Sequence, residues 1–166
     1  KERDCLISRG GPSQCKVADS SESNDREDSV GGTASELFLM TIQGLIAQWP
    51  EGFTSNTPKE VLFVHELEIL ISVCNTVEAR VVLKDVLSKM VKCIGSNLDN
   101  IRPAQRVLQM FKNEKVITFL TCNTYESFRI LLPAIYRGGE LSWNPTVNKM
   151  VGLALQRLRS LDTSLF

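Results

Sequence analysis

Residues 144–161 read NPTVNKMVGLALQRLRSL, and this stretch decides the fold class. Its apolar side chains recur three and four residues apart, at Val147, Met150, Val151, Ala154, Leu158 and Leu161. That spacing places them on one face of an α-helix. The stretch opens with Asn144, a good capping residue, followed by Pro145, which needs no amide hydrogen bond in the first turn. The sequence therefore predicts an amphipathic helix that begins at Asn144.

The same helical period extends upstream to about residue 35. Leu83, Val86, Leu87 and Met90, for example, repeat the spacing. No stretch alternates apolar and polar residues between hairpin turns, so a β-sheet is not expected. Capping residues, glycines and prolines divide this part of the chain into about seven helices, at residues 33–48, 57–74, 75–95, 101–112, 115–122, 123–137 and from 144 onward.

Local signals set several of these boundaries. The segments Thr33–Glu36 and Asn75–Glu78 have the spacing of a capping box, in which the first and fourth side chains close the free amides of the first turn. Gly138–Gly139 directly follows Arg137, and glycine commonly terminates a helix. We therefore expect helices to begin at Thr33 and near Asn75, and one to end at Arg137.

The predicted helices recur as pairs about every 40 residues, near 37–73, 77–111 and 116–158. Short connections favour antiparallel neighbours, and this period is typical of HEAT or armadillo-like units. The sequence predicts an all-α protein in which helical hairpins stack into an α-solenoid. A closed helix bundle is the alternative, because periodicity alone favours it nearly as well. Trp49 is expected to pack between repeats.

Composition separates residues 1–34 from residues 35–166. The chain has 166 residues, 19 basic and 19 acidic, enough for one domain and without the basic surplus of nucleic-acid proteins. Residues 1–34 are polar, lack aromatic side chains and hold 7 acidic and 5 basic residues, so we expect a disordered tail or insertion. No apolar run reaches membrane-spanning length. Lys1 in place of Met indicates a fragment or a processed chain.

The chain shows no motif for catalysis, for a metal or for a cofactor. The odd count of five cysteines, none spaced as C-x-x-C, favours reduced thiols in the cytoplasm or nucleus. His65 is the only histidine, which excludes a histidine-rich zinc site, and it is expected on a helix flank. Nucleophile elbows and phosphate-binding glycine loops are also absent from the sequence. We therefore expect a non-enzyme without cofactors.

Five residues are candidates for partner binding: Asn113, Glu114, Arg137, Trp143 and Asn144. Asn113 and Glu114 break a helix, and the alternatives are a plain tight turn or a partner contact. Arg137 either complements the negative end of its helix or binds an acidic partner. Trp143 is either a buried anchor for its loop or an exposed contact, and Asn144 is first of all a helix cap.

A series of short strings in a fixed order carries a family resemblance. The strings are Trp49-Pro50, Pro58-Lys59-Glu60-Val61-Leu62-Phe63, Glu66-Leu67-Glu68-Ile69-Leu70, Val91-Lys92-Cys93-Ile94, Ala104-Gln105-Arg106, Phe111-Lys112-Asn113-Glu114, Leu131-Leu132-Pro133-Ala134-Ile135-Tyr136-Arg137 and Trp143-Asn144-Pro145-Thr146-Val147. In this order, residues 57–166 resemble the B-prime regulatory subunits of protein phosphatase 2A.

The resemblance implies a function as well as a fold. It implies HEAT-like repeats from the C-terminal half of a longer subunit that is not an enzyme. Such a subunit docks on the scaffold and catalytic subunits of the phosphatase and directs the choice of phosphoprotein substrates, with neither nucleic acid nor membrane as a partner. The alternative is a generic helical-repeat adaptor unrelated to the phosphatase.

Overall fold

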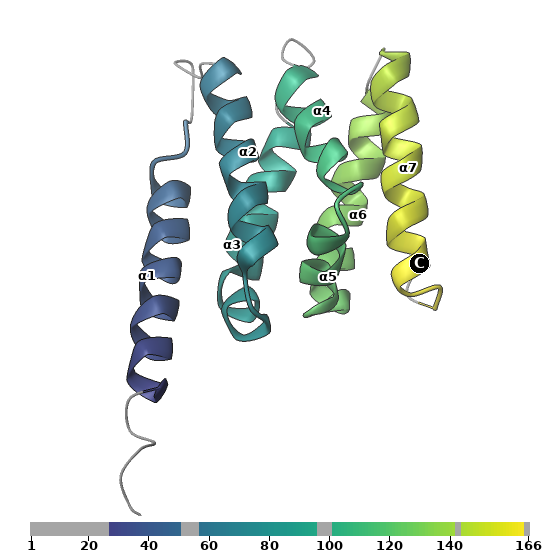
Figure 1. The fold of residues 1–166 in the computed structure, drawn as a ribbon. Helices are drawn as coiled ribbons and strands as arrows, with labels where there is room; N and C mark the ends of the chain where they lie inside the picture. The colour runs from purple at the N-terminus through teal and green to yellow at the C-terminus, as the bar shows by residue number, and fades with distance from the viewer. Residues whose placement is uncertain (1–26, 51–56, 96–100, 142–143, 165–166) are drawn as a thin grey trace, which may run out of the picture.

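The computed structural model describes residues 27–50, 57–95, 101–141 and 144–164, and every regular element in these ranges is an α-helix (Figure 1). The helices are α1 (Glu27–Ala47), α2 (Thr57–Val73), α3 (Thr76–Gly95), α4 (Ile101–Met110), α5 (Glu114–Thr121), α6 (Thr124–Leu141) and α7 (Pro145–Leu161). The prediction of an all-α chain with about seven helices is confirmed. No helix in the described ranges combines the length and apolarity that crossing a membrane requires.

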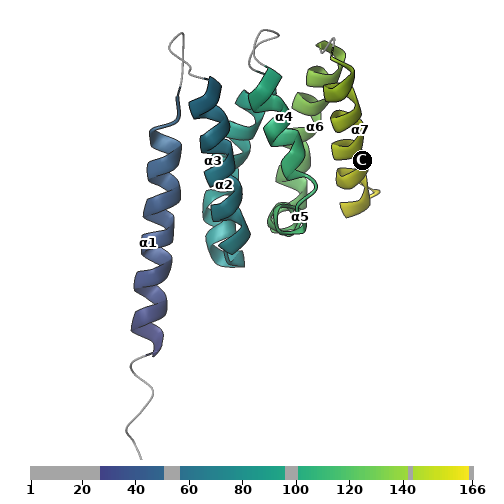
Figure 2. The ribbon, with the colours of Figure 1, turned by 45° about the horizontal axis from the view of Figure 1, so that its top comes forward.

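The helices form two layers that run side by side from α1 to α7 (Figures 1 and 2). In one layer α3 packs between α1 and α6, and in the other α4 packs between α2 and α7. Within each hairpin α1 meets α2, α3 meets α4, and α6 meets α7. Helices therefore contact only near neighbours in the stack, which is the arrangement of an α-solenoid.

Asparagine side chains begin four of the helices. Asn75 Oδ1 accepts hydrogen bonds from the backbone amides of Val77 and Glu78, both at 2.9 Å, and Glu78 Oε2 accepts from the Asn75 amide at 3.0 Å. This is the predicted capping box, with both ends satisfied. The side chains of Asn113, Asn123 and Asn144 cap α5, α6 and α7 in the same way.

Helix α1 begins earlier than predicted. It starts at Glu27 rather than at Thr33, so Thr33 lies inside the helix and is not its cap. Each residue added to an existing helix gains a backbone hydrogen bond, whereas only the first turn carries the cost of nucleation. Residues 27–34, which we expected to be disordered, are thus helical in the structure, and the rest of that predicted segment, 1–26, lies outside the described residues.

Helix α6 continues past the glycines that were predicted to end it. It reaches Leu141, so the expected end at Arg137 is wrong. A Cβ atom on Gly138 would lie 2.8 Å from Ile94 Cγ2, and one on Gly139 would lie 3.0 Å from Val151 Cγ1. The two glycines therefore allow α6 to approach the end of α3 and the middle of α7 closely.

A continuous apolar core fills the space between the two layers. Every helix with described side chains contributes to it, and its most enclosed large members include Ile42, Leu67, Leu87, Met110, Phe111, Leu120, Leu131, Ile135 and Leu158. The face of the layer formed by α2, α4, α5 and α7 is held by polar contacts as well, and these form the candidate site.

Candidate partner-binding face

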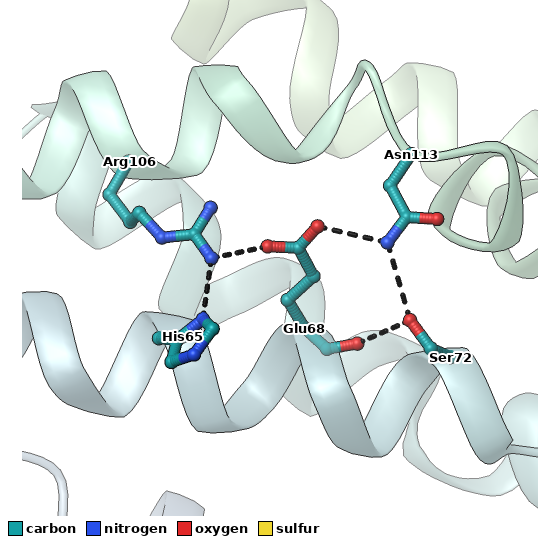
Figure 3. A network of polar contacts seen from close by, with 5 residues as sticks. All are labelled: His65, Glu68, Ser72, Arg106 and Asn113. Atoms are coloured by element: carbon teal, nitrogen blue, oxygen red, sulfur yellow. Dashed lines mark hydrogen bonds and ion pairs between the residues drawn. The ribbon is translucent and has the colours of Figure 1, made fainter.

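A row of polar side chains crosses from α2 to α4 and α5, with the Glu68 carboxylate at its centre (Figure 3). Arg106 Nη2 forms an ion pair with Glu68 Oε2 at 2.5 Å, and Asn113 Nδ2 donates a hydrogen bond to Glu68 Oε1 at 2.9 Å. The side chains of Arg106 and Glu68 are only 21% and 16% exposed. Both carboxylate oxygens are therefore occupied by charged or polar donors, in a setting where water screens the ion pair less than on an open surface.

The same guanidinium nitrogen of Arg106 also contacts the ring of His65. Arg106 Nη2 lies 2.7 Å from His65 Nδ1. A guanidinium group can only donate, so Nδ1 must accept. His65 is exposed on one side of α2, as the sequence predicted.

Asn113 joins three elements with one side-chain amide. Its Oδ1 accepts from the Lys115 amide at 3.0 Å and so caps α5. Its Nδ2 donates to Glu68 and to Ser72 Oγ at 3.3 Å, while Ser72 Oγ itself donates to the Glu68 carbonyl at 2.8 Å. The bend between α4 and α5 is therefore tied to α2.

An exposed ion pair extends the row to α7. Arg157 Nη2 lies 2.9 Å from Glu114 Oε1, and the two side chains are 45% and 71% exposed. Exposed pairs of this kind contribute about 0–1 kcal/mol. Glu114 and Arg157 are therefore better described as accessible charges than as a structural bond.

The structure brings together two of the five predicted site residues. Asn113 and Glu114 are adjacent on the face just described. Arg137 is exposed on α6, in the other layer, and Asn144 is the half-buried cap of α7, where its Oδ1 accepts from the Thr146 amide at 2.9 Å. Trp143 lies outside the described residues.

The sequence did not single out Glu68 and Arg106 as members of this face. They lie 38 positions apart, and Arg106 is 41 positions from His65, so no local spacing relates them. Their presence in two of the strings that carry the family resemblance was the only available signal.

A second polar contact is buried between α2 and α3. Cys93 Sγ lies 3.5 Å from Glu60 Oε1, to which it donates, and both residues are at most 6% exposed. Burial raises the pKa of the Cys93 thiol, and the Glu60 carboxylate raises it further. The thiol is therefore protonated and unreactive at neutral pH. Trp49 is 6% exposed and meets Phe63 edge-on at 5.7 Å, as expected for a residue packed between repeats.

Two hollows flank the polar row. One of about 490 Å³ lies between α2 and α4 and includes Arg106 in its lining. The other, of about 420 Å³, lies between the end of α4 and α7 and includes Phe111, Lys112 and Arg157. No group of three potential metal-ligating side chains occurs in the ranges that the structure describes. A layered helical stack with an open polar face defines a helical-repeat interaction protein.

The chain belongs to the family of protein phosphatase 2A regulatory B subunits (B56 family), whose sequence profile matches residues 33–166. That range covers all of α2–α7 and most of α1. The predicted resemblance to B-prime regulatory subunits is thereby confirmed.

Individual relatives share about a quarter to a third of the aligned residues. The human serine/threonine-protein phosphatase 2A 56 kDa regulatory subunit delta isoform is 30% identical over 132 residues, which are 80% of this chain and 21% of the relative. The fission yeast (Schizosaccharomyces pombe) delta 1 isoform is 29% identical over 80% of this chain and 23% of its own length. The B' alpha isoform of the Arabidopsis thaliana 57 kDa regulatory subunit is 28% identical over 79% of this chain and 26% of its own length. The chain thus spans about a fifth to a quarter of these relatives.

Proposed function

We propose that this chain is a non-catalytic regulatory component of protein phosphatase 2A. It docks on the scaffold and catalytic subunits and contributes to the choice of phosphoprotein substrates. The observation that carries the proposal is the family match across residues 33–166, which includes six complete helices of the stack and most of the seventh.

The architecture supports docking by shape and by individual side chains. Solenoids present extended surfaces because each repeat contacts only its neighbours. Here Glu68 and Asn113 hold α2, α4 and α5 in one arrangement before any partner binds. A surface that is already ordered loses less conformational entropy on association. The charges of Glu114 and Arg157 are exposed on the same face and are the first candidates for contact with a partner subunit.

Size-exclusion chromatography with purified scaffold and catalytic subunits tests assembly. The chain is expected to co-elute with the two subunits. The double substitution Glu114→Lys/Arg157→Glu exchanges the two charges, so it should preserve the ion pair between positions 114 and 157 but weaken co-elution. Arg80→Glu, on the exposed side of α3, is the matched control and should not change it. Failure of the chain to co-elute under conditions in which a full-length B56 subunit assembles would overturn the docking proposal and leave a helical-repeat adaptor.

The non-catalytic part of the proposal has a separate test. The purified chain is expected to release no phosphate from a phosphopeptide, while the catalytic subunit does so in a parallel reaction. Phosphate release that persists through successive purification steps and co-elutes with the chain would contradict it.

We also propose a cytoplasmic or nuclear location. Cys74, Cys93 and Cys122 are free thiols in the structure, which fits a reducing compartment. Fluorescence microscopy of the tagged full chain tests this, and accumulation in the secretory pathway would contradict it.

A further inference from the structure

We propose that the hollow between α2 and α4 binds a phosphorylated segment of a partner protein. The hollow has a volume of about 490 Å³ and is lined by Pro58, Val61, Arg102, Gln105, Arg106 and Gln109. This volume is within the usual range of ligand sites and far exceeds the space of a single inorganic ion. The inference does not depend on assembly with the phosphatase, because the site lies wholly within this chain.

The α4 side of the hollow is lined only by arginine and glutamine side chains, all of which can donate hydrogen bonds. Arg102, Gln105, Arg106 and Gln109 follow the i, i+3, i+4, i+7 spacing and so share one face of the helix. No acidic side chain lines the hollow, and α4 contains none.

Arg106 is positioned so that part of its guanidinium group remains available. Its contacts to Glu68 and His65 both use Nη2, and the other terminal nitrogen makes no contact in Figure 3. Within the described ranges, Nε and Nη1 have no hydrogen-bond partner. Glu68 thus fixes the orientation of the group and leaves its remaining donors for a ligand. Arg102 is exposed and has no ion pair with any described residue.

The chemistry of the lining favours a phosphorylated peptide over other anions. A phosphate group offers three acceptor oxygens and nearly two negative charges, which match two guanidinium groups and two amides. A carboxylate has only two oxygens and one charge, and the two oxygens of Glu68 are already occupied by Arg106 and Asn113. The hollow contains no aromatic side chain on which a nucleic-acid base could stack. Pro58 and Val61 supply an apolar wall for a residue next to the phosphorylated one.

Fluorescence anisotropy with the full chain tests the proposal. The probe is a fluorescein-labelled ten-residue peptide of alanine and leucine with one central phosphoserine. The same peptide with an unphosphorylated serine is the control. We expect saturable binding of the phosphopeptide, weakened by about tenfold or more in Arg102→Gln and in Arg106→Lys, because each change removes charge-assisted hydrogen bonds. Arg80→Gln, an exposed arginine on α3, should bind as the unchanged chain does.

Three results would overturn the proposal. Equal binding of the serine peptide would show that phosphate is not recognised. If inorganic phosphate displaces the labelled peptide at the same concentration as the unlabelled phosphopeptide does, the hollow binds an adventitious ion only. Stronger displacement by a single-stranded oligonucleotide would assign the hollow to nucleic acid. Arg102→Gln changes an exposed side chain, so an unchanged melting temperature separates lost binding from lost folding.

Discussion

At the scale of single residues, Asn113 shows how one side chain can serve two roles. It caps α5 through Oδ1 and reaches Glu68 on α2 through Nδ2. Asn123 caps α6 through its Oδ1, and its side chain makes no hydrogen bond to another helix among the described residues. The two asparagines therefore form a natural comparison between a cap alone and a cap with a tertiary contact.

Asn113→Ala is expected to lower the free energy of unfolding by about 2–3 kcal/mol, because it removes both the cap and a donor to a partly buried carboxylate. Asn123→Ala should lower it by about 1 kcal/mol, the usual cost of a lost cap. Urea unfolding followed by circular dichroism measures both. Equal losses in the two variants would show that the contact to Glu68 contributes nothing to stability.

The cysteines give a second residue-scale prediction. Burial raises the pKa of Cys74 to about 12, with Glu78 adding to the effect, and burial with Glu60 raises that of Cys93 as well. A raised pKa means less thiolate at any given pH, and thiolate is the reactive form. The alkylation rates of both should still be rising at pH 9–10, where an ordinary thiol with a pKa of about 8.5 has levelled off.

Mass spectrometry of tryptic peptides after timed treatment with iodoacetamide measures each site separately. Cys93, which is fully buried, should be the slowest of the described cysteines, and half-buried Cys122 should react earlier. In urea all sites should react at similar rates. Rapid labelling of Cys93 in the folded chain at pH 8 would contradict its assigned environment.

At the scale of elements, glycines in helices have opposite effects at different positions. Gly152 in α7 has no atom within 4 Å of the place where a Cβ would lie, whereas Gly138 in α6 faces Ile94 Cγ2 at 2.8 Å. Alanine is preferred over glycine in a helix by about 1 kcal/mol when space allows it. Where space is absent, the stiff β-branched side chain of Ile94 has to move.

Gly152→Ala is therefore expected to stabilise the fold by about 0.5–1 kcal/mol, and Gly138→Ala to destabilise it by about 1–3 kcal/mol through overpacking. Thermal and urea unfolding measure both. Ile94→Ala removes the obstructing atom, so the effects of Gly138→Ala and Ile94→Ala should not add in the double variant. Strict additivity would show that α6 and α3 do not touch at this position.

The helices that the sequence predicted correctly are those with local signals. Asn75 and Glu78 lie three residues apart, and their capping box depends on nothing beyond that spacing. Gly138 was misread because a glycine that ends a helix and a glycine that admits a neighbouring helix look the same in sequence. Thr33 was misread because a capping motif inside a longer helix is simply not used.

The candidate face was predictable only in part, because only some of its residues are related by local sequence spacing. Asn113 and Glu114 are adjacent in sequence and could be found as a helix break. Glu68, Arg106 and His65 meet only after α4 packs on α2, so their relation depends on tertiary structure that periodicity does not encode.

At the scale of the whole molecule, the stack has a centre and two ends. α3 and α4 have neighbours on both sides, whereas α1 contacts only α2 and α3 among the helix pairs with substantial packing. Leu37 and Met40 on α1 are 66% and 70% exposed. In such arrays stability is approximately the sum of contributions from neighbouring repeats.

Amide hydrogen exchange is therefore expected to be graded along the chain. Protection should be greatest in α3 and α6 and least in α1, because opening α1 breaks the fewest helix contacts. Mass spectrometry of exchanged peptides measures the gradient. Uniform protection from α1 to α7 would indicate a single cooperative unit rather than a stack.

The bend between α4 and α5 also sets the direction of the chain within the stack. A continuous helix in that place would behave as a straight rod, but here two short rods meet at Asn113, whose amide is tied to α2. The hydrogen bonds of Asn113 lie where the two rods meet, so they help to set the angle between them. A change in that joint would turn α5 relative to α4 and would have to repack the buried side chains by which α5 contacts α2, α3 and α6.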